Sequence, residues 1–237
     1  MKKIDNLRKK ALFSAAVAAF AMLFIVPNAQ AEHKPRQSWY ATASSMRVID
    51  ANGSGPRIDL GSSVVQQATI DYNGNMAWSL AVGHEGALCR GACAPQNVRL
   101  EVECVTGSID RKSIDVPGSH ILLDDTVKFR AIFLNGVLGI VDTPHTRWWL
   151  GAGIGYGQTK FPDASSATSC GCLQPLTHDD VAFRVKLQAE REISKNAALF
   201  AEAGYIKLTG GETHTIPGVD YGSLNLTNLA LGIRVYL

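Results

Sequence analysis

The residues best suited to catalysis or metal binding in this chain are its six histidines and five cysteines. Most of the histidines lie in segments rich in Gly, Pro, Ser, Asp and Thr, which are typical of loops. A loop histidine is more often solvated than catalytic, and a metal site built from loop histidines with Cys170 and Cys172 is not expected. The histidines are His33, His84, His120, His145, His178 and His214.

The cysteines allow at most a local covalent link. Cys89 and Cys93 lie in the sequence CRGAC and could form a small disulfide in an oxidising compartment. Cys170 and Cys172 are two positions apart, where a disulfide between them would be strained. Cys104 lies within a predicted strand and acts there as a small apolar side chain. The pairing stays open, because spacing alone does not fix connectivity.

The N-terminus differs in composition from the rest of the chain. Residues 1–10, MKKIDNLRKK, are basic and precede an apolar run of 16 residues. This run is shorter than the roughly 20 residues of a spanning helix. Ala29 and Ala31 then form an A-x-A cleavage pattern. We therefore predict a signal peptide over residues 1–31, cleaved before Glu32.

Removal of this segment changes the charge balance. The segment holds five of the 23 basic and one of the 21 acidic residues, which leaves 18 and 20 and a net charge of −2. This charge gives no reason to expect a nucleic-acid partner. Residues 32–237 are predicted to form one domain with no later transmembrane helix and no cofactor.

A period of two, the period of β-strands, dominates this domain. In residues 181–193, VAFRVKLQAEREI, apolar side chains alternate with polar ones, and AALFAEAGYIKL continues the pattern after a short turn. Two long strands joined in this way form an antiparallel hairpin. Eight strands are predicted, at residues 38–49, 75–84, 97–107, 125–140, 146–161, 180–193, 196–208 and 224–237.

The links between these strands alternate in length. The short links are residues 85–96, 141–145 and 194–195, and the long ones are 50–74, 108–124, 162–179 and 209–223. Short periplasmic turns alternating with long external loops are typical of outer-membrane barrels.

The alternation of apolar and charged faces is compatible with two kinds of barrel. If the apolar faces point outward, six basic and four acidic side chains share the lumen and can pair there. These predicted lumen residues are Arg99, Glu101, Glu103, Lys128, Arg130, Arg184, Lys186, Glu190, Glu202 and Arg234. If the apolar faces point inward, the chain is a soluble ligand-binding barrel, and alternation alone leaves this alternative open.

The last strand favours the membrane barrel. In LTNLALGIRVYL, apolar residues occupy alternate positions up to Leu237, and Arg234 lies on the other face. This ending resembles the C-terminal signal by which outer-membrane barrels are recognised for assembly, although Leu237 replaces the usual Phe.

The strand RWWLGAGIGYGQTKF, residues 147–161, has two different faces. Gly151, Gly153, Gly155 and Gly157 are predicted to face the lumen and leave room for charged side chains of other strands. Trp148 and Tyr156 bracket its apolar face over roughly 20 Å of membrane height. The predicted aromatic girdle is Trp78, Trp148, Tyr156 and Tyr205.

Three segments carry a family resemblance: RWWLGAGIGYGQTKF, which is similar to a Y-x-G-A-G-x-G-Y strand, FLNGVLGIVD before it, and the final LGIRVYL. Over residues 39–237 the chain resembles the small outer-membrane β-barrel proteins of Gram-negative bacteria, OmpA-like or opacity-protein-like and often labelled "porin family". The resemblance implies a monomeric eight-stranded barrel that acts as a surface antigen, adhesin or envelope-stabilising protein. Its implied partners are outer-membrane lipid and lipopolysaccharide, the barrel-assembly machinery through the C-terminal strand, and a host or environmental ligand at the loops.

Some barrels of this size are lipid A deacylases, with a histidine, a serine two residues later and a carboxylate. No histidine here has serine at that position, so no catalytic residue is expected. We predict an all-β protein, an eight-stranded antiparallel up-and-down transmembrane β-barrel in the cell outer membrane, with no enzymatic activity. The alternatives are a narrow channel for small solutes and the soluble secreted ligand-binding barrel.

Overall fold

The computed structural model describes residues 37–53, 57–59, 65–88, 96–143, 146–164, 173–209 and 218–237. The predicted signal peptide lies outside these residues. The described residues form strands and turns without any helix. None of them belongs to a helix long and apolar enough to cross a membrane.

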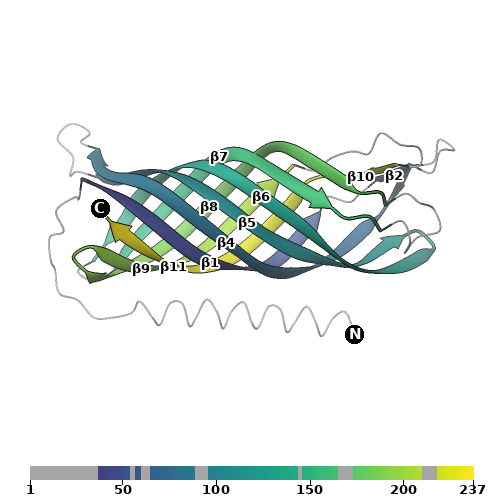
Figure 1. Cartoon of the computed structure of the whole chain (residues 1–237), viewed down its shortest axis with the longest axis horizontal. Helices are drawn as coiled ribbons and strands as arrows, with labels where there is room; N and C mark the ends of the chain where they lie inside the picture. Colours follow the sequence, from purple (N-terminus) through teal and green to yellow (C-terminus); the bar gives the residue numbers. More distant parts are fainter. Residues whose placement is uncertain are drawn as a thin grey trace.

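Eight long strands form a closed antiparallel barrel in the order β1-β11-β9-β8-β7-β6-β5-β4 (Figure 1). The first strand pairs with the last, so that Tyr40 lies opposite Tyr236, and no edge is left open. The strands are β1 (Ser38–Gly53), β4 (Thr69–Leu88), β5 (Gln96–Val116), β6 (Ser119–Asp142), β7 (Arg147–Phe161), β8 (Leu176–Ser194), β9 (Ala197–Leu208) and β11 (Leu224–Tyr236). The predicted eight-stranded all-β barrel is confirmed.

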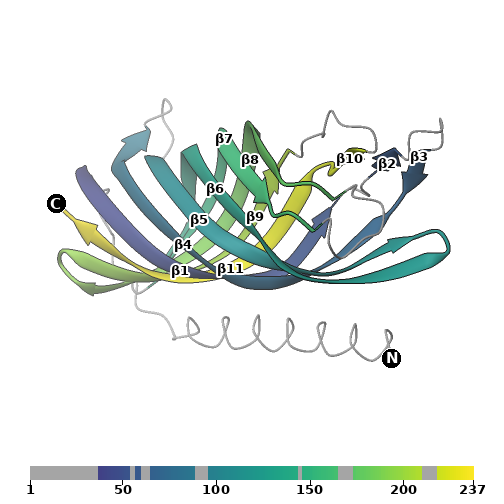
Figure 2. The ribbon, with the colours of Figure 1, turned by 45° about the vertical axis from the view of Figure 1, so that its right-hand side comes forward.

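The two ends of the barrel differ. We call the end that holds the start of β1, the end of β11 and the tight turn between β8 and β9 the inner end, and the opposite end the outer end. At the outer end, β5 and β6 extend as a long hairpin (Figure 2). A three-stranded sheet of β2 (Arg57–Asp59), β3 (Val65–Gln67) and β10 (Gly218–Asp220) lies at the same end (Figures 1 and 2).

The prediction of a loop over residues 108–124 is wrong. Strands β5 and β6 continue through this segment and meet at a two-residue turn, Pro117 and Gly118. Gly118 has φ of 85°, a left-handed conformation that glycine adopts without steric cost. The Pro-Gly pair is the turn signal, and the polar composition around it belongs to strands that project beyond the membrane.

The outer surface of the barrel is apolar over a continuous belt. On β7 the outward side chains include Leu150, Ile154 and Tyr156, and the last of these is 61% exposed. The same pattern holds on β4 and β11, where Leu80 and Leu231 are 64% and 66% exposed. Single exposed apolar side chains are common in soluble proteins, but a continuous apolar belt around a barrel is typical of contact with hydrocarbon. The soluble-barrel alternative is therefore wrong.

The predicted orientation of Lys128 and Arg130 is also wrong. Both are exposed on the outer surface of β6, whereas Phe129 and Phe133 are buried in the lumen. Buried and exposed positions alternate regularly from Val127 through Asn135, without a bulge. Near the outer end of β6, the side chains that face the lumen are apolar and those on the outer surface are charged. This reverses the pattern of the inner half, because here the outer surface is no longer in contact with lipid.

Candidate functional site

Arg99 lies at the centre of the ionic cluster in the inner half of the lumen. Its Nη2 donates to Glu85 Oε2 at 2.7 Å and to Glu190 Oε1 at 2.9 Å, and its Nε and Nη1 make further bonds to the same two carboxylates. The side chains of Arg99, Glu85 and Glu190 are fully buried. A guanidinium satisfies two carboxylates in this way because its donors form a planar fork.

Arg147 and Tyr236 extend this cluster across the barrel. Arg147 donates to Glu85 at 3.1 Å, to Glu190 at 2.8 Å and to Glu192 at 2.8 Å. The hydroxyl of Tyr236 accepts from both Arg99 and Arg147 and donates to Glu190 at 2.9 Å. Since β4, β5, β7, β8 and β11 all contribute, the cluster ties most of the barrel wall together at its inner end.

A second group of ion pairs lies next to the first. Lys186 pairs with Glu101, and with Glu103 at 3.1 Å. Arg184 pairs with Glu202 at 2.5 Å and with Glu103 at 3.3 Å. Two neutral groups complete it, because Asn135 donates to Glu101 and Glu103 at 3.1 and 2.8 Å and Tyr40 donates to Glu101 at 2.9 Å. Arg234 connects the two groups through Glu190 and Gln188.

Aromatic rings cover the flat faces of the buried guanidinium groups. Arg99 lies over the ring of Trp149 with its Cζ 3.4 Å from the centroid. Arg234 lies 4.6 Å from the ring centroid of Tyr40. Such contacts replace part of the lost hydration of a buried cation.

The four glycines of β7 line the lumen beside these side chains. A Cβ at Gly151 would lie 3.0 Å from Lys186, and one at Gly153 would lie 1.9 Å from Asn135. At Gly155 it would meet the backbone oxygen of Ile132, and at Gly157 the side chain of Leu208. Gly151, Gly153 and Gly157 therefore make room for side chains in the lumen, whereas Gly155 allows the backbone of β6 to approach closely.

The outer half of the lumen is filled by an apolar plug. Its large members come from β1, β5, β6, β7, β9 and β11 and are buried. They include Met46, Val105, Ile109, Phe129, Phe133, Phe161, Ile206 and Leu226. Ile58 of β2 and Val219 of β10 belong to the same cluster, so the outer sheet packs against the plug.

One ion pair is embedded at the top of the plug. Arg111 is buried and donates to both oxygens of Asp125 at 2.6 Å, and to the carbonyl oxygen of Pro162 at 3.2 Å. Phe161 and Tyr221 stack with ring centroids 4.0 Å apart beside it. Burial raises the pKa of Tyr221, which lies between strands at the outer end. The phenol is therefore neutral at physiological pH.

The structure places the predicted residues as follows. Apart from Lys128 and Arg130, the predicted lumen charges are all buried inside the barrel. Trp78, Tyr156 and Tyr205 are exposed on the outer surface, and Trp148 is half-buried. Cys104 is also exposed on the outer surface. Cys89, Cys93, Cys170 and Cys172 lie outside the described residues, as do His33, His145 and His214.

Sequence reasoning missed several members of the inner cluster. Glu85 lies one residue beyond the predicted strand 75–84, and Arg147 lies at the start of the predicted strand 146–161. Tyr40, Asn135 and Tyr236 are uncharged and were therefore not among the predicted lumen charges. Extending the alternation from Gly83 to the next inward position would have found Glu85. Among the described residues, no group of three or more His, Cys, Asp or Glu side chains is arranged to hold a metal ion.

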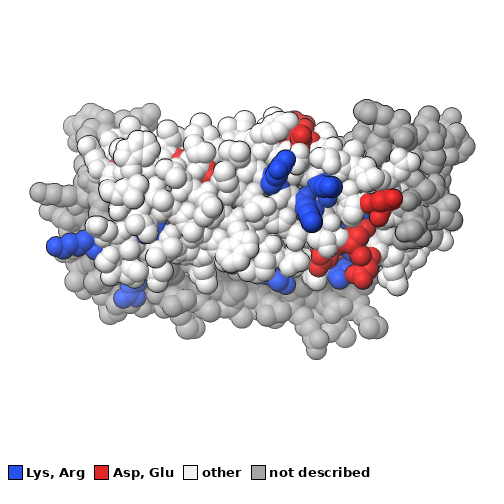
Figure 3. Space-filling model, viewed as in Figure 1, with Lys and Arg blue, Asp and Glu red and all other residues white. Residues whose placement is uncertain are grey.

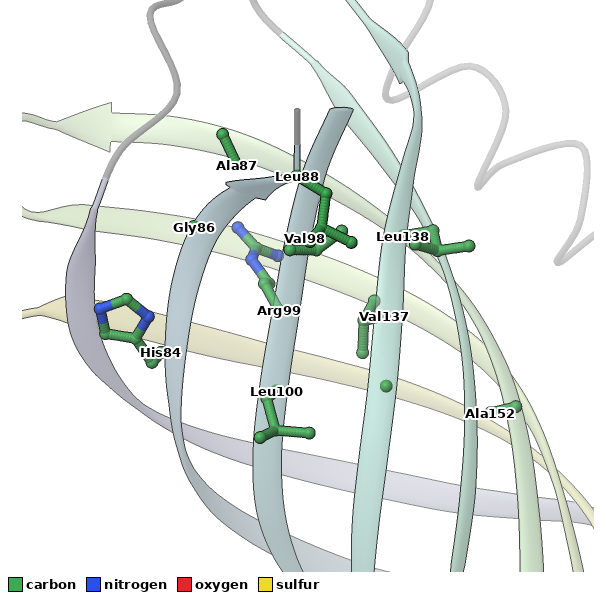
Figure 4. A pocket seen from close by; sticks show the side chains of 11 residues that line it. His84, Gly86, Ala87, Leu88, Val98, Arg99, Leu100, Val137, Leu138 and Ala152 are labelled. Atoms are coloured by element: carbon green, nitrogen blue, oxygen red, sulfur yellow. The ribbon is translucent and has the colours of Figure 1, made fainter. Parts of the chain in front are cut away.

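A hollow of about 600 Å³ lies on the outer surface of β4 to β7 (Figure 4). Leu88, Val98, Leu100 and Leu138 surround it, and His84 is its exposed ionisable side chain (Figure 4). No serine, cysteine or carboxylate belongs to this lining, and Arg99 is buried behind it and bonded to Glu85 and Glu190. The described lining of this hollow is therefore mainly apolar.

A closed antiparallel barrel with an apolar exterior and an ionic, side-chain-filled interior is a transmembrane β-barrel of the outer-membrane type. No family model matches the sequence. No curated protein matches it either.

Solved structures share the architecture at low similarity. Neisserial surface protein A is 13% identical with a TM-score of 0.48, covering 84% of this chain and 97% of that one. OprG, an outer membrane protein from Pseudomonas aeruginosa, is 12% identical with a TM-score of 0.47, covering 84% and 96%. The outer membrane protease OmpT from Escherichia coli is 9% identical with a TM-score of 0.43, covering 86% and 99%. Values this low assign no activity to this chain.

Proposed function

We propose that this protein is a non-enzymatic, non-conducting barrel of the outer membrane that presents its outer sheet and loops to the environment, as an antigen or adhesin or in support of the envelope. The observation that carries the proposal is the double closure of the lumen. Ion pairs around Arg99 fill the inner half, and the apolar plug around Phe133 fills the outer half.

This closure argues against the narrow-channel alternative. A conducting path needs a continuous column of water, and an apolar constriction excludes water and ions. The outer sheet adds to the closure, because Ile58 and Val219 pack into the plug. The part of the molecule free to meet a partner is therefore the outer sheet and the long links around it.

Planar-bilayer recording tests this proposal directly. The purified, folded chain is expected to give no conductance steps above those of protein-free membranes. Discrete steps that depend on the folded chain would overturn it in favour of a channel.

Surface proteolysis of intact cells, combined with fractionation, tests orientation. The folded chain should enter the outer-membrane fraction and show heat-modifiable gel mobility. Cleavage should fall within residues 50–74 or 209–223 and spare the turn at Lys195 and Asn196. Cleavage at that turn alone would contradict the proposed display of the outer end.

Partners are part of the same proposal. The closed β1–β11 seam supports a monomer, because the barrel wall itself has no open strand edge with which a second copy could pair. The outward apolar residues of β11 support recognition by the barrel-assembly machinery, and the outer loops are the proposed contact with a host or environmental ligand. The apolar belt supports contact with outer-membrane lipid.

A further inference from the structure

Three cations form a compact group on the outer surface of β6 and β7, here called the basic cluster: Lys128, Arg130 and Lys160. All three are exposed. Lys128 and Lys160 are direct partners across the two strands, and Arg130 is the partner of Gln158. The three positive charges therefore occupy adjacent positions on the outward face of β6 and β7.

This placement is unfavourable without a counter-charge. Like charges directly opposite each other in a sheet destabilise the pair. Within the described residues, none of the three cations forms an ion pair with a carboxylate. Asp179 is the partner of Gln158 rather than of a cation, and Asp110 accepts a hydrogen bond from Thr126 at 3.0 Å. The cluster therefore has room for an anion from outside the chain.

The position of the cluster indicates where that anion lies. The next outward residues toward the inner end are Ile132 and Tyr156, which are 57% and 61% exposed and belong to the apolar belt. Figure 3 shows that one half of this face is largely uncharged and that Lys and Arg side chains begin at its border, with Asp and Glu side chains beyond them. Lysine and arginine at such a boundary extend their charged ends to the level of the lipid headgroups.

We propose that the basic cluster binds phosphate groups of the glycolipid in the outer leaflet, of the lipid A kind carried by lipopolysaccharide. This inference rests on the proposed function, because it needs the outer end to face outward. A guanidinium can grip a phosphate with two parallel hydrogen bonds, and two lysines supply point charges beside it. The adjoining apolar belt, at Ile132 and Tyr156, receives the acyl chains of the same lipid.

Binding of purified lipid A to the full folded chain in detergent micelles tests the inference. Wild-type protein and the K128Q/R130Q/K160Q variant are titrated with bisphosphorylated lipid A and with its dephosphorylated form, and dissociation constants are read by native mass spectrometry. Three cations near a phosphate layer correspond to a loss on the order of 100-fold in affinity for the phosphorylated lipid. The dephosphorylated lipid should bind both proteins equally weakly.

The matched control is R191Q/K195Q, which removes two exposed cations near the inner end. It should bind phosphorylated lipid A like the wild type, and all variants should show the same heat-modifiable mobility. Equal affinity of the triple variant and the wild type, or equal loss in the control, would overturn the inference. A chain that needs no detergent and shows no heat-modifiable form would instead refute the proposed function.

Discussion

Toward its inner end the lumen holds Arg99, Arg147 and Arg234 with their carboxylates, and toward its outer end it holds Phe129 and Phe133 with other apolar side chains. The two halves differ in how they respond to the loss of one side chain. Removing a partner from a buried ionic cluster leaves an uncompensated charge, whereas trimming an apolar side chain leaves a cavity whose cost scales with its size. In the inner half, the loss of stability therefore depends on which charged group is removed. In the outer half, it depends on the volume that is removed.

Among the substitutions considered, Arg99→Leu is expected to cause the largest loss of stability. It leaves Glu85 and Glu190 buried without their main partner, at a cost of about 3–5 kcal/mol in unfolding free energy. Urea unfolding of the barrel in lipid vesicles measures this loss. Arg191→Leu, on the outer surface, is the control, and a cost below about 1 kcal/mol for Arg99→Leu would show that the cluster is not cooperative.

Phe133→Ala should cost about 3 kcal/mol, because it opens a cavity in the plug. Because the cost in this half depends on the volume removed, Phe133→Leu should recover most of the unfolding free energy that Phe133→Ala loses. By contrast, Arg99→Lys should recover little, because an ammonium cannot bridge two carboxylates with the same geometry. The same unfolding assay compares the two conservative variants, and similar recovery at both sites would remove the distinction.

Gly155→Ala should destabilise the barrel by about 1–3 kcal/mol, because its Cβ would lie 1.9 Å from the carbonyl oxygen of Ile132. Gly136→Ala is the matched control on the neighbouring strand, since nothing lies within 4 Å of the Cβ position there. The thermal midpoint of the heat-modifiable gel band reports both. Equal midpoints for the two variants would contradict close packing at the lumen face of β7.

Lys128→Gln should have the smallest effect. In lipid without phosphate groups it should change stability by no more than about 0.5 kcal/mol, and toward greater stability, because it relieves repulsion from Lys160. Unfolding in neutral detergent gives this value. A marked destabilisation would mean that Lys128 has a structural partner within the chain.

The strand order and part of the inner cluster were accessible from the sequence, whereas Glu85, Arg147 and Tyr236 were missed. Alternation in residues 181–193 places Arg184, Lys186 and Glu190 on one face, and the apolar final strand supports the same orientation. What alternation does not supply is the side of the barrel on which each face lies. On β6 both faces change polarity at the membrane boundary. Phe129 therefore faces the lumen and Arg130 faces outward, the reverse of what their residue types suggest.

The continuation of β5 and β6 through residues 108–124 was not predicted, for a related reason. Residues of β5 and β6 beyond the membrane, such as Asp110 and Asp124, are polar on the outside because water replaces lipid there. A polar strand outside the bilayer has the composition of a loop. The signals that separate them are Pro117-Gly118 at the turn and the buried positions Ile109 and Val127, which continue the inward phase.

The pairing of Tyr40 with Tyr236 has a kinetic meaning. The seam joins the strands that are first and last in the chain, so it is the contact of greatest sequence separation. Until it forms, β1 and β11 each present an edge whose amides and carbonyls lack partners, which is costly in hydrocarbon. We therefore expect membrane insertion and barrel closure to occur together in one late, cooperative step.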